Sequence, residues 1–310
     1  MASNITEESL GVVESLINIG CALSVLGFIV NIVVLLIINR VVFIRKTTRW
    51  FIFNQSLIDA TGCLLFFVLS LLPFSPFDCF YNRITLWFQS ATFTLSTASS
   101  VNVLFISVER YFAIIKPFWF ETNYTVKRTV IMMVSAWILG ILCHPTMLIM
   151  LYKIITQNIQ CDDDDGEEKE ELARKITTNI IPVVCISTIL ILVLIYTRII
   201  FELVKMKNNV SNQMTSSIHV KTLKVFIAVS TAYIVCFVPI IVFLYGDIFV
   251  SKGIRKYVAV DLVVLNFSLN PFIYTISLSQ FRTEVINIFQ TGCCKNRGEQ
   301  GSTHLTLNNV

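Results

Sequence analysis

The segment Leu269-Asn270-Pro271-Phe272-Ile273-Tyr274 decides the fold, because it places a proline inside a long apolar stretch. Proline removes a backbone donor and its ring clashes with the preceding turn, so neighbouring polar groups must satisfy the broken helix. Asn266, Asn270 and Tyr274 follow one another at i, i+4 and i+8, so their side chains project from one face. Amide and phenol groups are costly against lipid, so this face is predicted to point into a bundle of membrane helices.

The composition is that of a membrane protein. Of the 310 residues, 55% are hydrophobic and 14% are charged, and the mean hydropathy is +0.73. A soluble domain carries about a quarter charged residues. Spans of roughly 20 residues cross about 30 Å of hydrocarbon, and seven apolar stretches reach this length, at residues 15–39, 51–73, 86–115, 129–152, 177–201, 223–247 and 257–278. The predicted fold is an all-α bundle of seven transmembrane helices.

The basic residues of the short loops predict the orientation in the membrane. Residues 40–49 hold four basic side chains and no acid, whereas residues 162–171 hold eight acids. We therefore expect a plasma-membrane protein with its N-terminus outside, its C-terminus inside and no cleaved signal peptide. The predicted regions are an extracellular N-terminus (1–14), the seven-span domain (15–278), an amphipathic surface helix (279–290) and a cytoplasmic tail (291–310).

Several positions are candidates for covalent modification. Cys79 and Cys161 are the two cysteines of the predicted extracellular loops, an oxidising compartment, so they are expected to form a disulfide. Asn4 begins a glycosylation sequon on the same side. Cys293 and Cys294 follow the predicted surface helix on the cytoplasmic side, where S-acylation would anchor it to membrane lipids.

The chain resembles the rhodopsin-like family of G protein-coupled receptors over nearly its whole length. The resemblance rests on motifs that occur in the family's order, namely Asn31, Asn54 with Asp59, Glu109-Arg110-Tyr111, Trp137, Cys236-Phe237-Val238-Pro239 and Asn270 to Tyr274. Phe281 then begins the family's membrane-surface helix. The resemblance implies a receptor in which an extracellular ligand moves the sixth helix outward and activates a heterotrimeric G protein. It implies arrestin and a receptor kinase as further partners, and no nucleic acid.

Asp59 is the only acid of the second span, where an unpaired carboxylate would be very costly. The family places this aspartate beside a serine and two asparagines, here Ser99, Asn266 and Asn270. An oxygen-rich cluster suits a hard cation, and the resemblance implies an allosteric sodium ion. The alternative is a protonated Asp59 that is hydrogen-bonded to Asn31 and Asn270.

Glu109 and Arg110 end the third span, where an arginine often only anchors the helix at the membrane surface. In the family, this arginine pairs with its neighbouring acid at rest and turns to the G protein on activation. Tyr196 resembles the family's tyrosine of the fifth helix and is expected to meet Tyr274 in the active state. The predicted activation switch comprises Glu109, Arg110, Tyr111, Tyr196, Phe237, Pro239, Asn270, Pro271 and Tyr274.

The sixth span carries the predicted floor of the ligand pocket. Pro239 bends the helix, and Phe237 stands where the family usually has tryptophan. Tyr233 lies one turn earlier, and the resemblance adds Thr92 to the pocket, although such aromatics are more often core residues. Thr92 replaces the aspartate of amine receptors, and Val264 replaces the lysine of opsins. A retinal Schiff base is therefore excluded, and a monoamine would lack its main charge partner.

The acidic run at residues 162–171 is either a solvated, flexible loop or a funnel that concentrates a basic peptide. A peptide is the favoured ligand class. The rival classes are a seven-span transporter or channel, for which no internal repeat is found, and a constitutively active or partner-dependent receptor-like protein. An enzyme is not expected, since His144, His219 and His304 are too scattered for a metal site.

Overall fold

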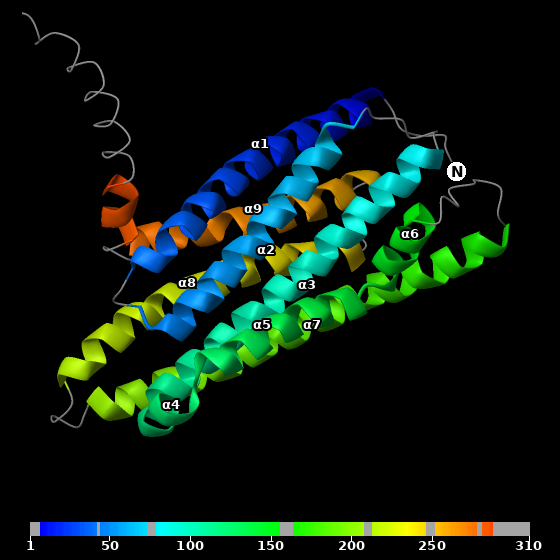
Figure 1. Cartoon of the computed structure of the whole chain (residues 1–310). Coiled ribbons are helices and arrows are strands. Elements are labelled where there is room, and N and C mark those ends of the chain that lie inside the picture. The colour runs from blue at the N-terminus through cyan, green and yellow to red at the C-terminus, as the bar shows by residue number, and fades with distance from the viewer. Residues whose placement is uncertain are drawn as a thin grey trace, which may run out of the picture.

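The computed structural model describes residues 7–41, 44–72, 79–155, 164–207, 213–245, 252–277 and 281–287. Within these ranges the regular structure is entirely helical (Figure 1). The elements are α1 (Glu7–Ile37), η1 (Ile38–Arg40), α2 (Lys46–Ser70), α3 (Cys79–Ile115), α4 (Pro117–Asn123), α5 (Val126–Leu142), α6 (Pro145–Ile155), α7 (Asp164–Lys207), α8 (Gln213–Tyr245) and α9 (Lys252–Ser277). Residues 281–287 form a further short helical segment.

The predicted bundle of membrane-spanning helices is confirmed. In the part of the chain that is described, six helices are long and apolar enough to cross a membrane, and a seventh span is reached if the bent pair α4–α5 counts as one. The two helices of this pair meet at 86°. The long helices run side by side, and α1 begins at the end of the bundle opposite the short C-terminal helix (Figure 1).

The predicted fourth span, residues 129–152, is not one helix. It is divided into α5 and α6 at Cys143 and His144, directly before Pro145. Proline disfavours helical geometry in the residue before it and cannot donate to the preceding turn, so the helix ends here. Thr97 of α3 lies 2.8 Å from Nε2 of the buried His144, which fixes the break against the bundle.

Two helices extend beyond their predicted spans. Helix α3 begins at Cys79, which was predicted to lie in a loop, and α7 begins at Asp164, inside the predicted acidic loop. The 44 residues of α7 reach about 66 Å at 1.5 Å per residue, roughly twice the hydrocarbon thickness. Acids near a helix N-terminus are favoured by the helix dipole, which gives a reason for helical backbone from Asp164 onward.

Helix α3 is the central element, since it contacts α2 and each helix from α4 to α8. Helix α1 packs on α2 and α9, and α8 also packs on α9. Close contact between α3 and α5 depends on Gly140, because a Cβ there would lie 2.7 Å from the backbone oxygen of Thr94. Small residues allow such close approach between membrane helices.

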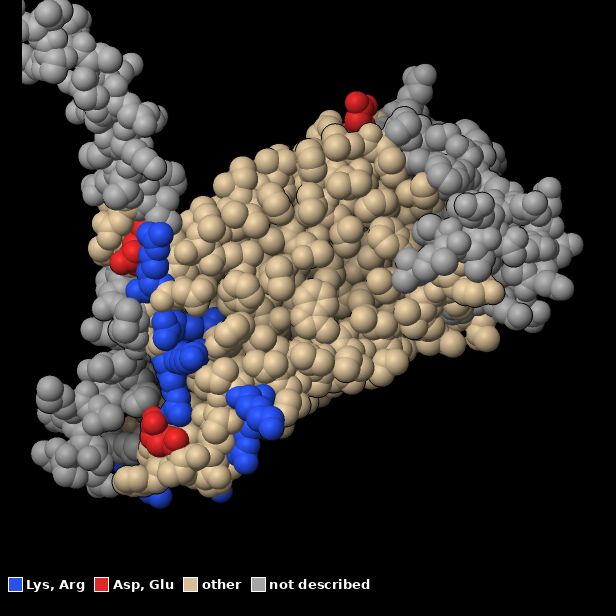
Figure 2. All heavy atoms as spheres, viewed as in Figure 1, with Lys and Arg blue, Asp and Glu red and all other residues tan. Residues whose placement is uncertain are grey.

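Charge is distributed unevenly along the bundle. Figure 2 shows most of the described lysines and arginines gathered at the end where α1 finishes and α2 begins, with the middle of the bundle free of visible charge. The interior differs from this apolar exterior, since it holds many buried polar side chains, including those of Asn31, Asn54, Asp59, Asn102 and Glu109. The polar groups that could carry function therefore lie inside the bundle.

Candidate functional site

A buried ion pair lies at the end of the bundle that carries the basic residues. Arg110 of α3 places Nη2 2.9 Å from Oε2 of its neighbour Glu109, and both side chains are buried. Thr47 and Thr48, in the first turn of α2, donate to Glu109 over 2.6 and 2.9 Å. Arg110 also donates to the hydroxyl of Thr48. The carboxylate thus meets three donor groups, as a buried charge requires.

Two aromatic side chains extend this cluster. The Arg110 guanidinium carbon lies 5.5 Å from the ring centroid of Phe226 on α8. The Tyr196 hydroxyl of α7 is 3.0 Å from Ser107 Oγ, and Ser230 of α8 donates to it over 3.3 Å. Tyr274 of α9 contacts neither Arg110 nor Tyr196 in these interactions. Its side chain is fully buried, and its hydroxyl has no hydrogen bond to a described residue.

A second buried carboxylate lies in the middle of the bundle. Asp59 Oδ1 accepts from Gln55 Nε2 over 2.9 Å and from Ser99 over 3.4 Å. Asn270 Nδ2 donates to Asp59 Oδ2 over 2.7 Å, so the interrupted helix α9 is joined here to α2. The structure therefore brings Ser99 and Asn270 to Asp59, as the sequence predicts, and adds Gln55. Asn266 is buried one turn before Asn270.

The orientation of the Gln55 amide is fixed by a chain of hydrogen bonds. Trp137 Nε1 donates to Asn54 Oδ1 over 3.0 Å. Asn54 Nδ2 donates to Asn102 Oδ1 over 2.9 Å, and Asn102 Nδ2 donates to Gln55 Oε1 over 2.8 Å. An indole can only donate, so each amide in turn must present its oxygen toward Trp137 and its nitrogen away from it. The N–H groups of Gln55 therefore point at Asp59.

This arrangement fits the predicted sodium ion poorly. A hard cation needs oxygen lone pairs, but Gln55 Nε2 lies 2.9 Å from Asp59 Oδ1 and 2.5 Å from Ser99 Oγ. Asn270 likewise presents its nitrogen to the carboxylate. The alternative prediction is a protonated Asp59 that is hydrogen-bonded to Asn31 and Asn270, and of these two partners the structure brings Asn270 to the carboxyl group. In that alternative Gln55 takes the place predicted for Asn31, whose amide donates to Gly27 and Phe267 carbonyls instead.

Tyr233 and Phe237, the predicted aromatic floor of the pocket, lie together in α8. Their rings stack with centroids 4.3 Å apart, and both side chains are buried in the turns that precede Pro239. Thr92 is also buried, and its hydroxyl donates to Phe88 of its own helix over 2.9 Å. These contacts agree with a packed core as well as with a pocket floor. Tyr111 stacks edge to face on Phe112, away from the Arg110 pair.

Sequence reasoning missed several residues of these networks, among them Gln55, Asn102, Thr47 and Thr48, and it also missed Asp261. Gln55 carried a readable signal, since it precedes Asp59 by one helical turn. Asp261 lies in α9 at the end opposite Arg110, where Oδ1 approaches the backbone of Gly20 and Oδ2 is buried with no partner among the described residues. The modification sites Asn4, Cys161, Cys293 and Cys294 lie outside the described residues, as does the side chain of Cys79.

The geometry defines a class of protein, namely a multi-pass membrane bundle whose two buried carboxylates connect α2 and α3, one of them beside an arginine. A family model described as "7 transmembrane receptor (rhodopsin family)" matches residues 30–274. The chain belongs to this family of receptors. It is a membrane receptor and not an enzyme, and a seven-span transporter or channel is not favoured.

Curated relatives agree with this assignment. The chain is 26% identical to the histamine H2 receptor of Cavia porcellus, over 90% of this chain and 80% of that receptor. It is 23% identical to the growth hormone secretagogue receptor type 1 of Oryctolagus cuniculus, over 86% of this chain and 78% of the relative. It is 25% identical to the sphingosine 1-phosphate receptor 3 of Takifugu rubripes, with coverages of 89% and 72%. The names of these relatives point to very different ligands.

Proposed function

We propose that the chain is a plasma-membrane receptor that converts the binding of an extracellular ligand into G protein activation through outward movement of α8. In this proposal the N-terminus is extracellular, and the end that holds Arg110 faces the cytoplasm. The gathering of basic residues at that end supports the orientation (Figure 2), since cytoplasmic loops carry the excess of lysine and arginine.

The observation that carries the proposal is the buried Arg110, whose guanidinium pairs with Glu109 and donates to Thr48. Its ion pair with Glu109 and its bond to Thr48 keep the guanidinium away from the surface where a G protein would bind. Helix α8 covers it with the ring of Phe226 and is tied to α7 through Ser230. If α8 moves outward, this cover is removed, and the arginine can turn toward a partner in the cytoplasm.

Paired substitutions test this function. Glu109→Gln keeps the size of the side chain but removes the charge that holds Arg110, so ligand-independent G protein activation is expected to rise several-fold. Arg110→Ala is expected to abolish activation while surface expression persists. Glu121→Gln is the matched control, because Glu121 is another acid at the same end, pairs with Arg45 and is 72% exposed. The proposal is wrong if Arg110→Ala signals normally or if both glutamate variants behave alike.

For the ligand, we favour a molecule with cationic groups, and among these a basic peptide. Eight acids at residues 162–171 would lie at the extracellular mouth, and six of them belong to the first turns of α7, which begins at Asp164. Asp261 adds a carboxylate oxygen without a partner among the described residues at the same end. Agonist potency that falls with salt, and loses this dependence when the run is neutralised, would support the proposal. Agonist potency that depends on neither the salt concentration nor the charge of this run would refute the proposal.

The remaining expectations also belong to this proposal. We place a disulfide between Cys79 and Cys161, a glycan on Asn4 and S-acylation on Cys293 and Cys294. The helix at 281–287 begins with the buried Phe281, whose ring centroid is 6.3 Å from that of Tyr274. This contact would tie the surface helix to α9. Arrestin and a receptor kinase are the expected partners of the cytoplasmic tail.

A further inference from the structure

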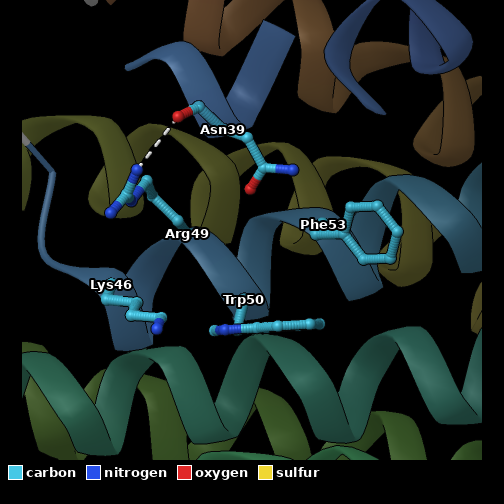
Figure 3. Close-up of a pocket in the computed structure, with 5 residues that line it drawn as sticks. All are labelled: Asn39, Lys46, Arg49, Trp50 and Phe53. Atoms are coloured by element: carbon cyan, nitrogen blue, oxygen red, sulfur yellow. Dashed lines mark hydrogen bonds between the residues drawn. The ribbon is translucent and has the colours of Figure 1, made fainter. Parts of the chain in front are cut away.

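A cavity of about 300 Å³ lies at the basic end of the bundle, between the end of α1 and the start of α2. It is lined by Asn39, Lys46, Arg49, Trp50 and Phe53 (Figure 3). Lys46 and Trp50 extend in the same direction from α2, while Arg49 reaches toward the backbone of Asn39. The lining therefore combines two cations, one backbone carbonyl and two aromatic rings.

Neither cation is neutralised by a residue that the structure describes. Arg49 Nη1 donates to the Asn39 carbonyl over 3.1 Å, but its Nε is buried and has no hydrogen-bond partner in the described part of the chain. Among the described residues, no carboxylate lies within ion-pair distance of Lys46 or Arg49. The neighbouring Arg45 differs, because Glu121 neutralises it at 2.7 Å. A buried guanidinium N–H without an acceptor is costly, and an anion that reached it would remove that cost.

The order of the lining residues along α2 adds a direction. From Lys46 to Phe53 the helix rises about 10 Å toward the middle of the membrane. Lys46 and Arg49 come first, then the indole of Trp50, and last the phenyl ring of Phe53. Cations at headgroup depth, tryptophan at the interface and an apolar ring below it match the layers of one leaflet of a bilayer. An occupant with a charged head and an apolar tail fits this order.

We propose that this cavity binds the phosphorylated headgroup of an anionic lipid of the cytoplasmic leaflet. Its phosphate oxygens accept from the free Nε and Nη groups of Arg49 and pair with Lys46, while the acyl chains pass Trp50 and Phe53. Arginine suits this role because its planar fork can donate two bonds to one phosphate group. The proposal rests on the orientation given under Proposed function, but it requires no G protein activation.

The test measures lipid binding to the purified full-length chain in nanodiscs by native mass spectrometry. Phosphatidylinositol bisphosphate, phosphatidylserine and phosphatidylcholine are the lipid probes, and inositol trisphosphate is the soluble probe. The pocket variant is Lys46→Gln with Arg49→Gln. The control is Lys127→Gln with Arg128→Gln, which removes the same charges from the exposed start of α5, outside the cavity. Thermal unfolding of each variant verifies its fold.

The bisphosphate lipid is expected to bind the parent chain and the control variant with equal affinity. Its affinity for the pocket variant is expected to be lower by about tenfold or more. Trp50→Ala is expected to weaken binding of the lipid and to leave binding of inositol trisphosphate unchanged. Equal losses in the two double variants would overturn the proposal, because they would indicate general surface charge. Inositol trisphosphate that binds as tightly as the lipid would assign the cavity to a free phosphate. An epitope-accessibility measurement in intact cells checks the orientation separately.

Discussion

The substitution Gln55→Leu is expected to make the protein bind sodium, which the parent chain is expected not to do. Leucine removes the amide that donates to Asp59 Oδ1 and Ser99 Oγ while keeping most of the volume. Asn102 is not orphaned, since its Nδ2 still donates to the Phe51 carbonyl over 3.2 Å. Asp59 and Ser99 then present free oxygen lone pairs to the vacated space, which is what a hard cation requires.

The size of the effect follows from the contacts that are lost. A hydrogen bond to a charged group contributes about 1.5–3 kcal/mol, so the variant should unfold at a lower temperature than the parent when sodium is absent. A ligand present at ten times its dissociation constant stabilises by about 1.4 kcal/mol. For a chain of 310 residues, that corresponds to a rise of about 2 °C in the unfolding temperature.

The assay is thermal unfolding of purified protein in sodium chloride and in choline chloride of equal ionic strength. Gln55→Leu should be stabilised by sodium, and the double variant with Asp59→Asn should lose this stabilisation because the charged ligand is gone. A sodium-dependent rise in the parent chain that Asp59→Asn removes would refute the reasoning. If the unfolding temperature of Gln55→Leu does not change with sodium, Gln55 is not the residue that excludes the ion.

Three further outcomes are expected. Gly140→Ala should lower the unfolding temperature, because the added Cβ meets a backbone oxygen of α3, whereas Gly11→Ala, with nothing within 4 Å, should not lower it. Trp137→Phe should cost about 1 kcal/mol, because it leaves Asn54 Oδ1 without its donor; thermal unfolding measures both effects. Asp261→Asn should reduce the potency of a cationic agonist in a concentration–response assay and leave basal signalling unchanged.

Much of the bundle follows from the sequence, because hydropathy and length are enough to locate apolar spans. The break before Pro145 was readable too, since proline restricts the preceding residue whatever surrounds it. The residues at which α3 and α7 begin could not be predicted in this way, because hydropathy indicates where a helix leaves the membrane and not where its backbone stops being helical. The acids at the start of α7 therefore looked like a loop.

The Asp59 cluster shows a different limit. Ser99 and Asn270 follow from the family resemblance, whereas Gln55 does not. The direction of the hydrogen bonds depends on Trp137, which lies 83 residues from Asn54 in the chain. Sequence identifies an amide without saying which of its ends faces a carboxylate. The hydrogen bonds that begin at Trp137, an obligatory donor, show that Gln55 presents its nitrogen to Asp59. The carboxylate is therefore held by hydrogen-bond donors and not by a cation.

The two buried carboxylates also indicate which helix is free to move. Asp59 and Glu109 bind donors from α2, α3 and α9, so separating these helices would strand a buried charge at a cost of about 3–5 kcal/mol. At the Arg110 end, the contacts of α8 described above are a ring face and one 3.3 Å hydrogen bond between Ser230 and Tyr196. Outward movement of α8 strands no buried charge, since it gives up these two contacts, of about 1 kcal/mol each, and the apolar packing of buried side chains such as Leu223 and Val229. The hydrogen-bond network therefore favours α8 as the moving element and α2, α3 and α9 as the frame against which it moves.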